Sequence, residues 1–72
     1  MPTFDRHRYR LARERAGLSR ESAARAIGCL PGTIRKVEMG DRSPSLDLLC
    51  RSLAVYRVDV AQVFTDEQLV AS

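Results

Sequence analysis

The sequence of 72 residues has no tryptophan, two cysteines, one histidine and no long hydrophobic run. Its longest unbroken apolar stretch is the four residues Leu53–Tyr56, whereas a membrane-spanning helix needs about 20. The N-terminal residues Met1–Asp5 have no long apolar core behind basic residues, as a secretory signal would. These absences predict a cytoplasmic protein with no membrane partner.

Metal-ligating side chains are equally scarce. A structural zinc site needs four ligands, and the chain offers only Cys29, Cys50 and His7 outside its carboxylates. One possible disulfide does not make a stabilising framework. Both cysteines lie in apolar settings, so we expect two small buried thiols and neither a metal nor another cofactor.

Catalytic patterns are missing as well. The sequence contains no phosphate-binding loop, no dinucleotide glycine pattern and no serine nucleophile motif. His7 lies on an arginine-rich segment, and we expect it to be solvated because a general base needs a positioned partner. Asp66 and Glu67 are interpreted as solubilising residues of the tail. We therefore predict that the protein is not an enzyme.

Positive charge is abundant and unevenly placed. Residues 1–42 hold ten basic and five acidic side chains, whereas residues 43–72 hold two basic and four acidic ones. Eleven of the twelve basic residues are arginine, which suits phosphate and guanine, although genome composition can also enrich it. A chain of this length forms one small domain. We predict a single domain over residues 1–72, with its core at about 5–64, a short tail at 65–72 and one face that meets a polyanion.

Apolar residues at helical spacing predict an all-α fold of five helices without strands. The helices are expected to begin near Asp5, Ser19, Pro31, Ser45 and Asp59, with Gly17, Gly28 and Gly40 ending the first three. Asp59 and Gln62 have the pattern of a capping box. The expected buried residues are Phe4, Tyr9, Ala12 and Ala16 for the first helix, and Leu46, Leu49, Cys50 and Leu53 for the fourth.

The connection between the second and third predicted helices is the most informative feature. Only Gly28-Cys29-Leu30 joins them, and this is too short for antiparallel helices, so they must cross steeply. Ala24 supplies the small residue that a close crossing needs, and Gly28 tolerates positive φ in the turn. This pattern predicts a helix-turn-helix.

A wider set of residues fits the same pattern: Arg13, Gly17-Leu18-Ser19, Gly28, Ile34, Glu38, Gly40 and Pro44-Ser45. With these residues the chain resembles the Cro and phage-repressor (XRE-type) helix-turn-helix family from about Tyr9 to Phe64. The resemblance implies a compact five-helix, lambda-repressor-like bundle that binds operator DNA as a dimer. It also implies that Arg13 and Glu38 form a buried structural ion pair between the first and third helices.

The resemblance implies that the third helix, Pro31–Met39, enters the major groove of double-stranded DNA. Leu30 stands where the family usually has a Ser or Thr cap, and neither Pro31 nor Gly32 can donate a side-chain hydrogen bond. Base reading is therefore expected from three residues further along, namely Thr33, Arg35 and Lys36.

Contacts with the DNA backbone are expected from four residues: Arg20, Gly32, Arg42 and Ser43. Arg20 begins the second helix, at a position where the family usually has Gln, and Arg42 and Ser43 follow the third helix. Gly32 either lets the backbone approach DNA closely or is a tolerated, helix-weakening glycine. Four other arginines lie near the first helix: Arg6, Arg8, Arg10 and Arg15. We expect most of them to be solvated and one or two to touch the DNA backbone.

Two functions follow from this reading. The first is a sequence-specific DNA-binding transcriptional regulator, a repressor that binds a palindromic operator as a homodimer. The dimer surface would use apolar residues left over from the core among Val55, Val58, Val60, Val63, Phe64, Leu69 and Val70. The alternative is an antitoxin or adapter module whose main partner is another protein, which Pro31-Gly32 and the apolar tail favour.

Overall fold

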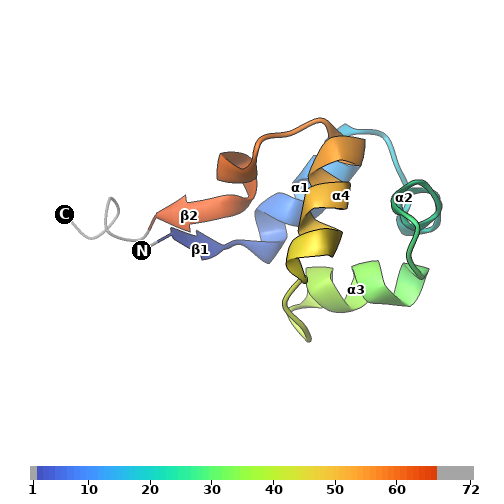
Figure 1. The fold of residues 1–72 in the computed structure, drawn as a ribbon, viewed down its shortest axis with the longest axis horizontal. Coiled ribbons are helices and arrows are strands. Elements are labelled where there is room, and N and C mark those ends of the chain that lie inside the picture. Colours follow the sequence, from blue (N-terminus) through green and yellow to red (C-terminus); the bar gives the residue numbers. More distant parts are fainter. Residues whose placement is uncertain (1, 67–72) are drawn as a thin grey trace.

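The computed structural model describes residues 2–66, which form four α-helices, one 3₁₀ helix and a two-stranded sheet (Figure 1). The elements in order are β1 (Pro2–Phe4), α1 (Arg6–Arg15), α2 (Arg20–Ile27), α3 (Pro31–Met39), α4 (Leu46–Tyr56), η1 (Val60–Val63) and β2 (Phe64–Asp66). The helices pack together in one body, and the sheet projects from it at the end where the chain begins. None of the helices within residues 2–66 has the length and apolar character needed to cross a membrane.

Local signals in the sequence set the helix boundaries. Three N-cap side chains accept hydrogen bonds from backbone N–H groups: Asp5 at the start of α1, Ser19 at the start of α2 and Ser45 at the start of α4. These residue types are favoured as N-caps. Gly28 and Gly40 end α2 and α3 with φ of 89° and 84°, a conformation that costs glycine little. The predicted starts and glycine stops of these helices are confirmed.

The predicted all-α, five-helix fold is wrong in two respects. The fifth segment is the four-residue 3₁₀ helix η1 followed by β2, and β2 pairs antiparallel with β1, with Phe4 opposite Phe64. The Phe4 and Phe64 rings meet edge-on at 5.9 Å, and the Asp5 N–H donates to the Val63 carbonyl at 2.8 Å. Three-residue strands are too short to show an alternating pattern, and their pairing joins segments about 60 residues apart in sequence.

The sheet uses residues near both ends of the chain. Pro2–Phe4 pairs with Phe64–Asp66, so Thr65 and Asp66, which were predicted to belong to a tail, lie in β2. Thr65 Oγ1 donates to Asp5 Oδ2 at 2.9 Å, which joins β2 to the N-cap of α1. The remainder of the predicted tail, including Leu69 and Val70, lies outside the described residues.

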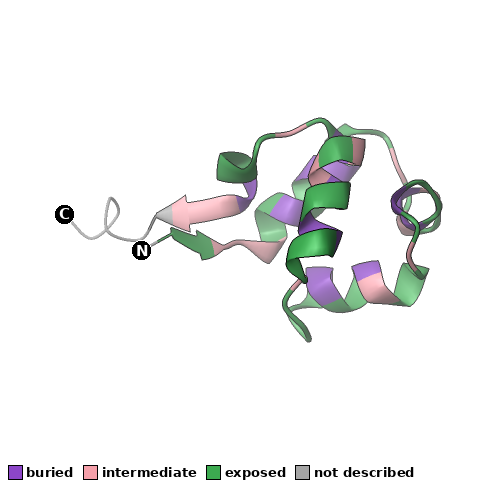
Figure 2. Cartoon of the chain, viewed as in Figure 1, coloured by how far each residue is buried: buried purple, intermediate pink, exposed green. Residues whose placement is uncertain are grey.

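The core lies between the four α-helices and η1. Tyr9, Ile34, Val37 and Val63 are fully buried there, with relative exposures of 0%. In Figure 2 the buried segments of α3 lie on the side toward the other helices, and its opposite side is exposed. The expectation that Ala16 is buried is wrong, because it follows the last turn of α1 and is exposed.

The buried face of α4 also differs from the prediction. Leu48, Leu49, Ser52 and Tyr56 are buried, whereas Leu46 is 77% exposed and Cys50 is exposed. A polar residue, Ser52, therefore lies at the centre of the inward face. It can be buried because its hydroxyl donates to the Leu48 carbonyl at 2.7 Å and bonds the Tyr9 hydroxyl at 2.6 Å.

Two buried tyrosines meet beside Ser52. The rings of Tyr9 and Tyr56 lie edge-on with centroids 5.7 Å apart. Burial raises the pKa of both hydroxyls, so both remain neutral at ordinary pH. The Tyr9 hydroxyl bonds Ser52, whereas the buried Tyr56 hydroxyl has no hydrogen-bond partner among the described residues.

This difference predicts unequal effects of removing the two hydroxyls. Tyr9→Phe should lower the free energy of unfolding by about 1 kcal/mol, because it removes the hydrogen bond and leaves Ser52 less well satisfied. Tyr56→Phe should cost less or be neutral. Urea unfolding of the two variants measures the difference, and an equal or larger loss for Tyr56→Phe would contradict it.

Candidate nucleic-acid interface

The turn between α2 and α3 determines how these two helices pack. The N–H groups of Gly28 and Cys29 both donate to the Ala24 carbonyl, at 2.8 and 2.9 Å, which closes α2 tightly. Ala23, Ala24 and Ile27 of α2 are buried, together with Ile34 and Val37 of α3. α2 and α3 therefore pack as one unit that exposes the opposite side of α3.

The exposed side of α3 is cationic at its centre. Arg35 and Lys36 are exposed, and so are Pro31, Gly32 and Met39, whereas Thr33 is half-buried. The only acidic residue of α3, Glu38, is 3% exposed and points inward. The outer side of this helix thus carries two positive charges and no negative one.

Glu38 is the residue through which α3 is attached to α1 and α2. Its carboxylate accepts hydrogen bonds from Arg13 Nε at 2.7 Å and from Arg13 Nη2 at 3.1 Å. Arg20 Nε of α2 donates to the same carboxylate at 3.1 Å. The hydrogen bond to Glu38 raises the pKa of Arg13, against the opposing effect of burial. Two guanidinium groups therefore fix the inner face of α3 through one carboxylate.

A third arginine also reaches Glu38. Arg6 Nη1 donates to the Glu38 backbone carbonyl at 3.1 Å, near the end of α3. A cation at this end is favourable because the last carbonyl groups of a helix lack partners within it. The sequence does not predict this contact of Arg6 with α3. Its spacing of seven residues from Arg13, two helical turns along the same side of α1, is the signal that could have identified it.

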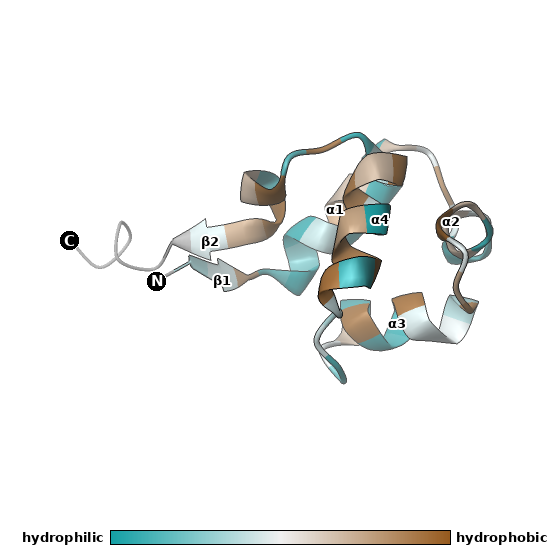
Figure 3. Cartoon of the chain, in the orientation of Figure 1, coloured by the Kyte–Doolittle hydropathy of each residue, from teal (hydrophilic) through white to brown (hydrophobic). Residues whose placement is uncertain are grey.

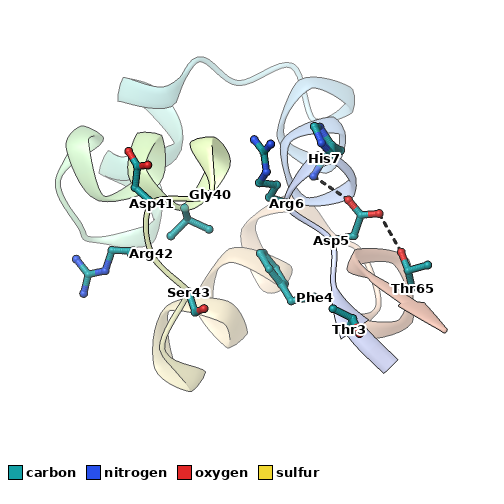
Figure 4. Close-up of a pocket in the computed structure, with 11 residues that line it drawn as sticks. Thr3, Phe4, Asp5, Arg6, His7, Gly40, Asp41, Arg42, Ser43 and Thr65 are labelled. Atoms are coloured by element: carbon teal, nitrogen blue, oxygen red, sulfur yellow. Dashed lines mark hydrogen bonds between the residues drawn. The ribbon is translucent and has the colours of Figure 1, made fainter. Parts of the chain in front are cut away.

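Arg20 and Arg42 lie in different surroundings. The Arg20 side chain is 38% exposed, although its Nε is bound to Glu38. Arg42 and Ser43 are exposed in the loop after α3, and Figure 4 shows the Arg42 side chain directed away from Arg6. Arg20 is therefore held in place by the protein, whereas Arg42 extends into solvent.

These observations agree with the comparison with known families. Residues 7–63 match the family described as helix-turn-helix domain. The chain belongs to the helix-turn-helix domain family. The match confirms the family predicted from the sequence and indicates a DNA-binding regulator. Neither the curated proteins nor the solved structures gave a match.

A cleft of about 740 Å³ adjoins the helix-turn-helix, between the N-terminal segment and the loop after α3 (Figure 4). Arg6 and Arg42 line it together with Asp5 and Asp41. Burial raises the pKa of Asp5, but hydrogen bonds from Thr65 and from two backbone N–H groups lower it further, so that it lies below its usual value. Because the lining carries both signs of charge, the cleft concentrates positive charge less than the outer side of α3 does.

The cysteines of the helix-turn-helix domain are not both buried, contrary to expectation. Cys29 is half-buried in the turn before α3, and burial raises the pKa of its thiol. Cys50 is exposed because it lies one turn after Leu46, on the outer side of α4. Within residues 2–66, no three side chains of His, Cys, Asp or Glu gather closely enough to hold a metal ion.

Proposed function

We propose that this helix-turn-helix domain is a sequence-specific DNA-binding transcriptional regulator, acting as a single domain over residues 1–72. The observation that carries the proposal is the exposed, cationic side of α3 on a compact pair of helices. In this arrangement α3 enters the major groove, where Arg35 and Lys36 donate to guanine O6 and N7. Thr33 is half-buried and nearer the start of α3, and its shorter side chain contacts a base or a phosphate.

The DNA backbone is bound by residues at the edges of this surface. Arg20 can contact a phosphate because a guanidinium has five N–H donors and only its Nε is used in the bond to Glu38. Arg42 and Ser43 contact a phosphate from the loop after α3. Gly32 brings the backbone of α3 close to the duplex. Phosphate contacts of this kind fix orientation, and base contacts give specificity.

A repressor that binds a palindromic operator as a homodimer is the form of regulation we favour. Of the apolar residues proposed for the dimer surface, Val60 is 54% exposed, whereas Val63 is fully buried. Pro2, Val60, Ala61 and Phe64 together line an apolar hollow beside the sheet and η1. We propose that this hollow contributes to the contact between two copies, because burying it removes apolar surface from water.

Footprinting on duplexes selected from a random library tests the DNA-binding proposal. We expect binding that weakens steeply with salt, because each neutralised phosphate releases counterions. A dimer on a palindrome should protect two half-sites about one helical turn apart. The absence of any salt-sensitive binding to duplex DNA would refute the proposal.

A second function is favoured by the apolar side chains at the two ends of α3. Leu30 is 73% exposed and Met39 is 52% exposed, and such groups suit a protein partner. In this alternative the domain is an antitoxin or adapter. A protein complex that resists salt, formed by a domain that binds no duplex, would favour the second function over the first.

The role of Arg42 can be tested by comparing the loss of its charge with the loss of the same charge elsewhere on the surface. Arg42→Gln should weaken binding to all duplexes alike and should reduce the slope of log affinity against log salt by about 1. Arg57→Gln is the control, because Arg57 follows the end of α4 that lies far from α3 in Figure 1. Titrations at several salt concentrations measure both slopes. Equal slopes for the two variants would argue against a phosphate contact at Arg42.

A further inference from the structure

The start of α3 has an unusual surface, formed by Leu30, Pro31 and Gly32, which we call the apolar tip. All three residues are exposed, and Leu30 is 73% exposed. In Figure 3 the chain entering α3 is hydrophobic and the first turn of α3 is only weakly polar. The apolar tip therefore presents an apolar side chain, a proline ring and bare backbone to solvent.

The fold gives no reason for glycine at position 32. A Cβ built on Gly32 meets no atom within 4 Å, and its φ lies outside the left-handed range found at Gly28 and Gly40. Glycine weakens a helix relative to alanine. Position 32 thus has room for a side chain, and the protein would gain helix stability from one.

The fold gives no reason for leucine at position 30 either. Leu30 is the N-cap of α3 and makes no side-chain hydrogen bond to it. The N-caps of the other three α-helices within residues 2–66, Asp5, Ser19 and Ser45, all make such bonds. Leu30 and Gly32 therefore both depart from the residue types that favour a stable helix. Such departures are expected where a surface serves binding.

Charge on the same side of α3 indicates the partner. Arg35 and Lys36 lie one turn after the apolar tip and are exposed with it, so a negatively charged partner would be oriented by them. A DNA duplex combines such charge with one apolar group in its major groove, the C5 methyl group of thymine. A partner with both features matches the whole exposed side of α3.

We propose that the apolar tip reads a thymine methyl group in the bound site. Leu30 packs on the methyl group, and the absence of a side chain at Gly32 lets the first turn of α3 approach the base edges. This inference rests on the proposed DNA-binding function and adds a specificity determinant to Thr33, Arg35 and Lys36.

Replacing thymine by uracil at each position of a selected site removes only the methyl group, which isolates this contact. At one thymine of each half-site the wild-type protein should lose about threefold to fivefold in affinity, the equivalent of one buried methyl-sized group. Leu30→Ala should bind the thymine site more weakly and should no longer distinguish thymine from uracil there. Folding of this variant is checked by circular dichroism, and the high exposure of Leu30 leads us to expect a native spectrum.

A second pair of variants tests the close approach at position 32. Gly32→Leu should weaken binding by about tenfold or more, a steric effect equivalent to one or two lost contacts, while the thermal midpoint of the free protein stays equal or rises. Ala54→Leu adds a leucine at an exposed position of α4 and should leave affinity unchanged.

The outcomes separate this inference from the function on which it rests. Tight, salt-sensitive binding by wild type that is indifferent to uracil at every position overturns the inference and leaves the DNA-binding function intact. The same holds if Gly32→Leu binds as tightly as wild type. A protein that selects no duplex at any salt concentration overturns both.

Discussion

Arg35→Ala and Lys36→Ala are each expected to reduce the preference of the protein for its selected DNA site over a scrambled duplex. A lost bidentate contact with a base costs about 1–3 kcal/mol of discrimination, or roughly fivefold to more than a hundredfold. Both side chains are exposed on the outer side of α3, so the substitutions should leave the thermal midpoint nearly unchanged. Affinities for the two duplexes at one fixed salt concentration measure the effect.

Arg15→Ala is the matched control for lost charge. Arg15 is exposed on α1, on the side opposite Arg6 and Arg13, which are the α1 residues that reach α3. Arg15→Ala should weaken binding to both duplexes slightly and leave the ratio of the two affinities unchanged. If Arg35→Ala and Lys36→Ala behave like Arg15→Ala, base reading is assigned to the wrong residues.

The parts of the fold that are encoded locally could be predicted from the sequence. A capping serine or aspartate, a glycine at positive φ and apolar spacing of three or four residues each act within a few positions of the chain. They predict α1 to α3 and the start of α4 to within a residue or two. The turn Gly28-Cys29-Leu30 could also be predicted, because a connection this short requires α2 and α3 to cross.

The sheet and the inward face of α4 could not be predicted, because both depend on distant partners. Phe4 pairs with Phe64 only after the helices have brought the two ends of the chain together. Ser52 occupies the core because Tyr9, 43 positions away, bonds its hydroxyl. Hydropathy alone assigns a serine to the surface. Leu49 is buried as predicted, whereas Leu46 and Cys50 were assigned to the wrong side of α4.

Only part of the candidate site could be predicted from the sequence, namely the part that depends on local spacing. Exposure of Arg35 and Lys36 follows from the buried positions Ile34 and Val37, which fix the orientation of α3. The bond between Arg20 and Glu38 could not be inferred, because it joins two helices through side chains with no periodic signature. Arg20 therefore has a structural partner in addition to its proposed phosphate contact.

Glu38→Gln is expected to have the largest effect on stability. The Glu38 side chain has 0% exposure and is shared by Arg13 and Arg20, at 2.7 and 3.1 Å. Removing the carboxylate leaves the buried Arg13 guanidinium without a counter-charge, a change that costs about 3–5 kcal/mol. For a domain of this size such a loss is a large fraction of the total free energy of unfolding. Chemical unfolding followed by circular dichroism measures it.

Glu14→Gln makes the same chemical change in an exposed ion pair. Glu14 bonds Arg10 at 3.2 Å with both side chains about half exposed, so its loss should cost about 1 kcal/mol or less. Similar losses for Glu14→Gln and Glu38→Gln would mean that the buried carboxylate does not hold α3.

Replacing both members of the buried pair separates stability from DNA binding. Arg13→Met combined with Glu38→Leu removes both charges together, so much of the stability lost in Glu38→Gln should return. Arg20 then has no carboxylate to hold its guanidinium, and its phosphate contact should lose the advantage of a fixed position. A double variant that unfolds like wild type yet binds all duplexes more weakly would establish that Glu38 positions Arg20. Wild-type affinity in a stable double variant would restrict Glu38 to attaching α3.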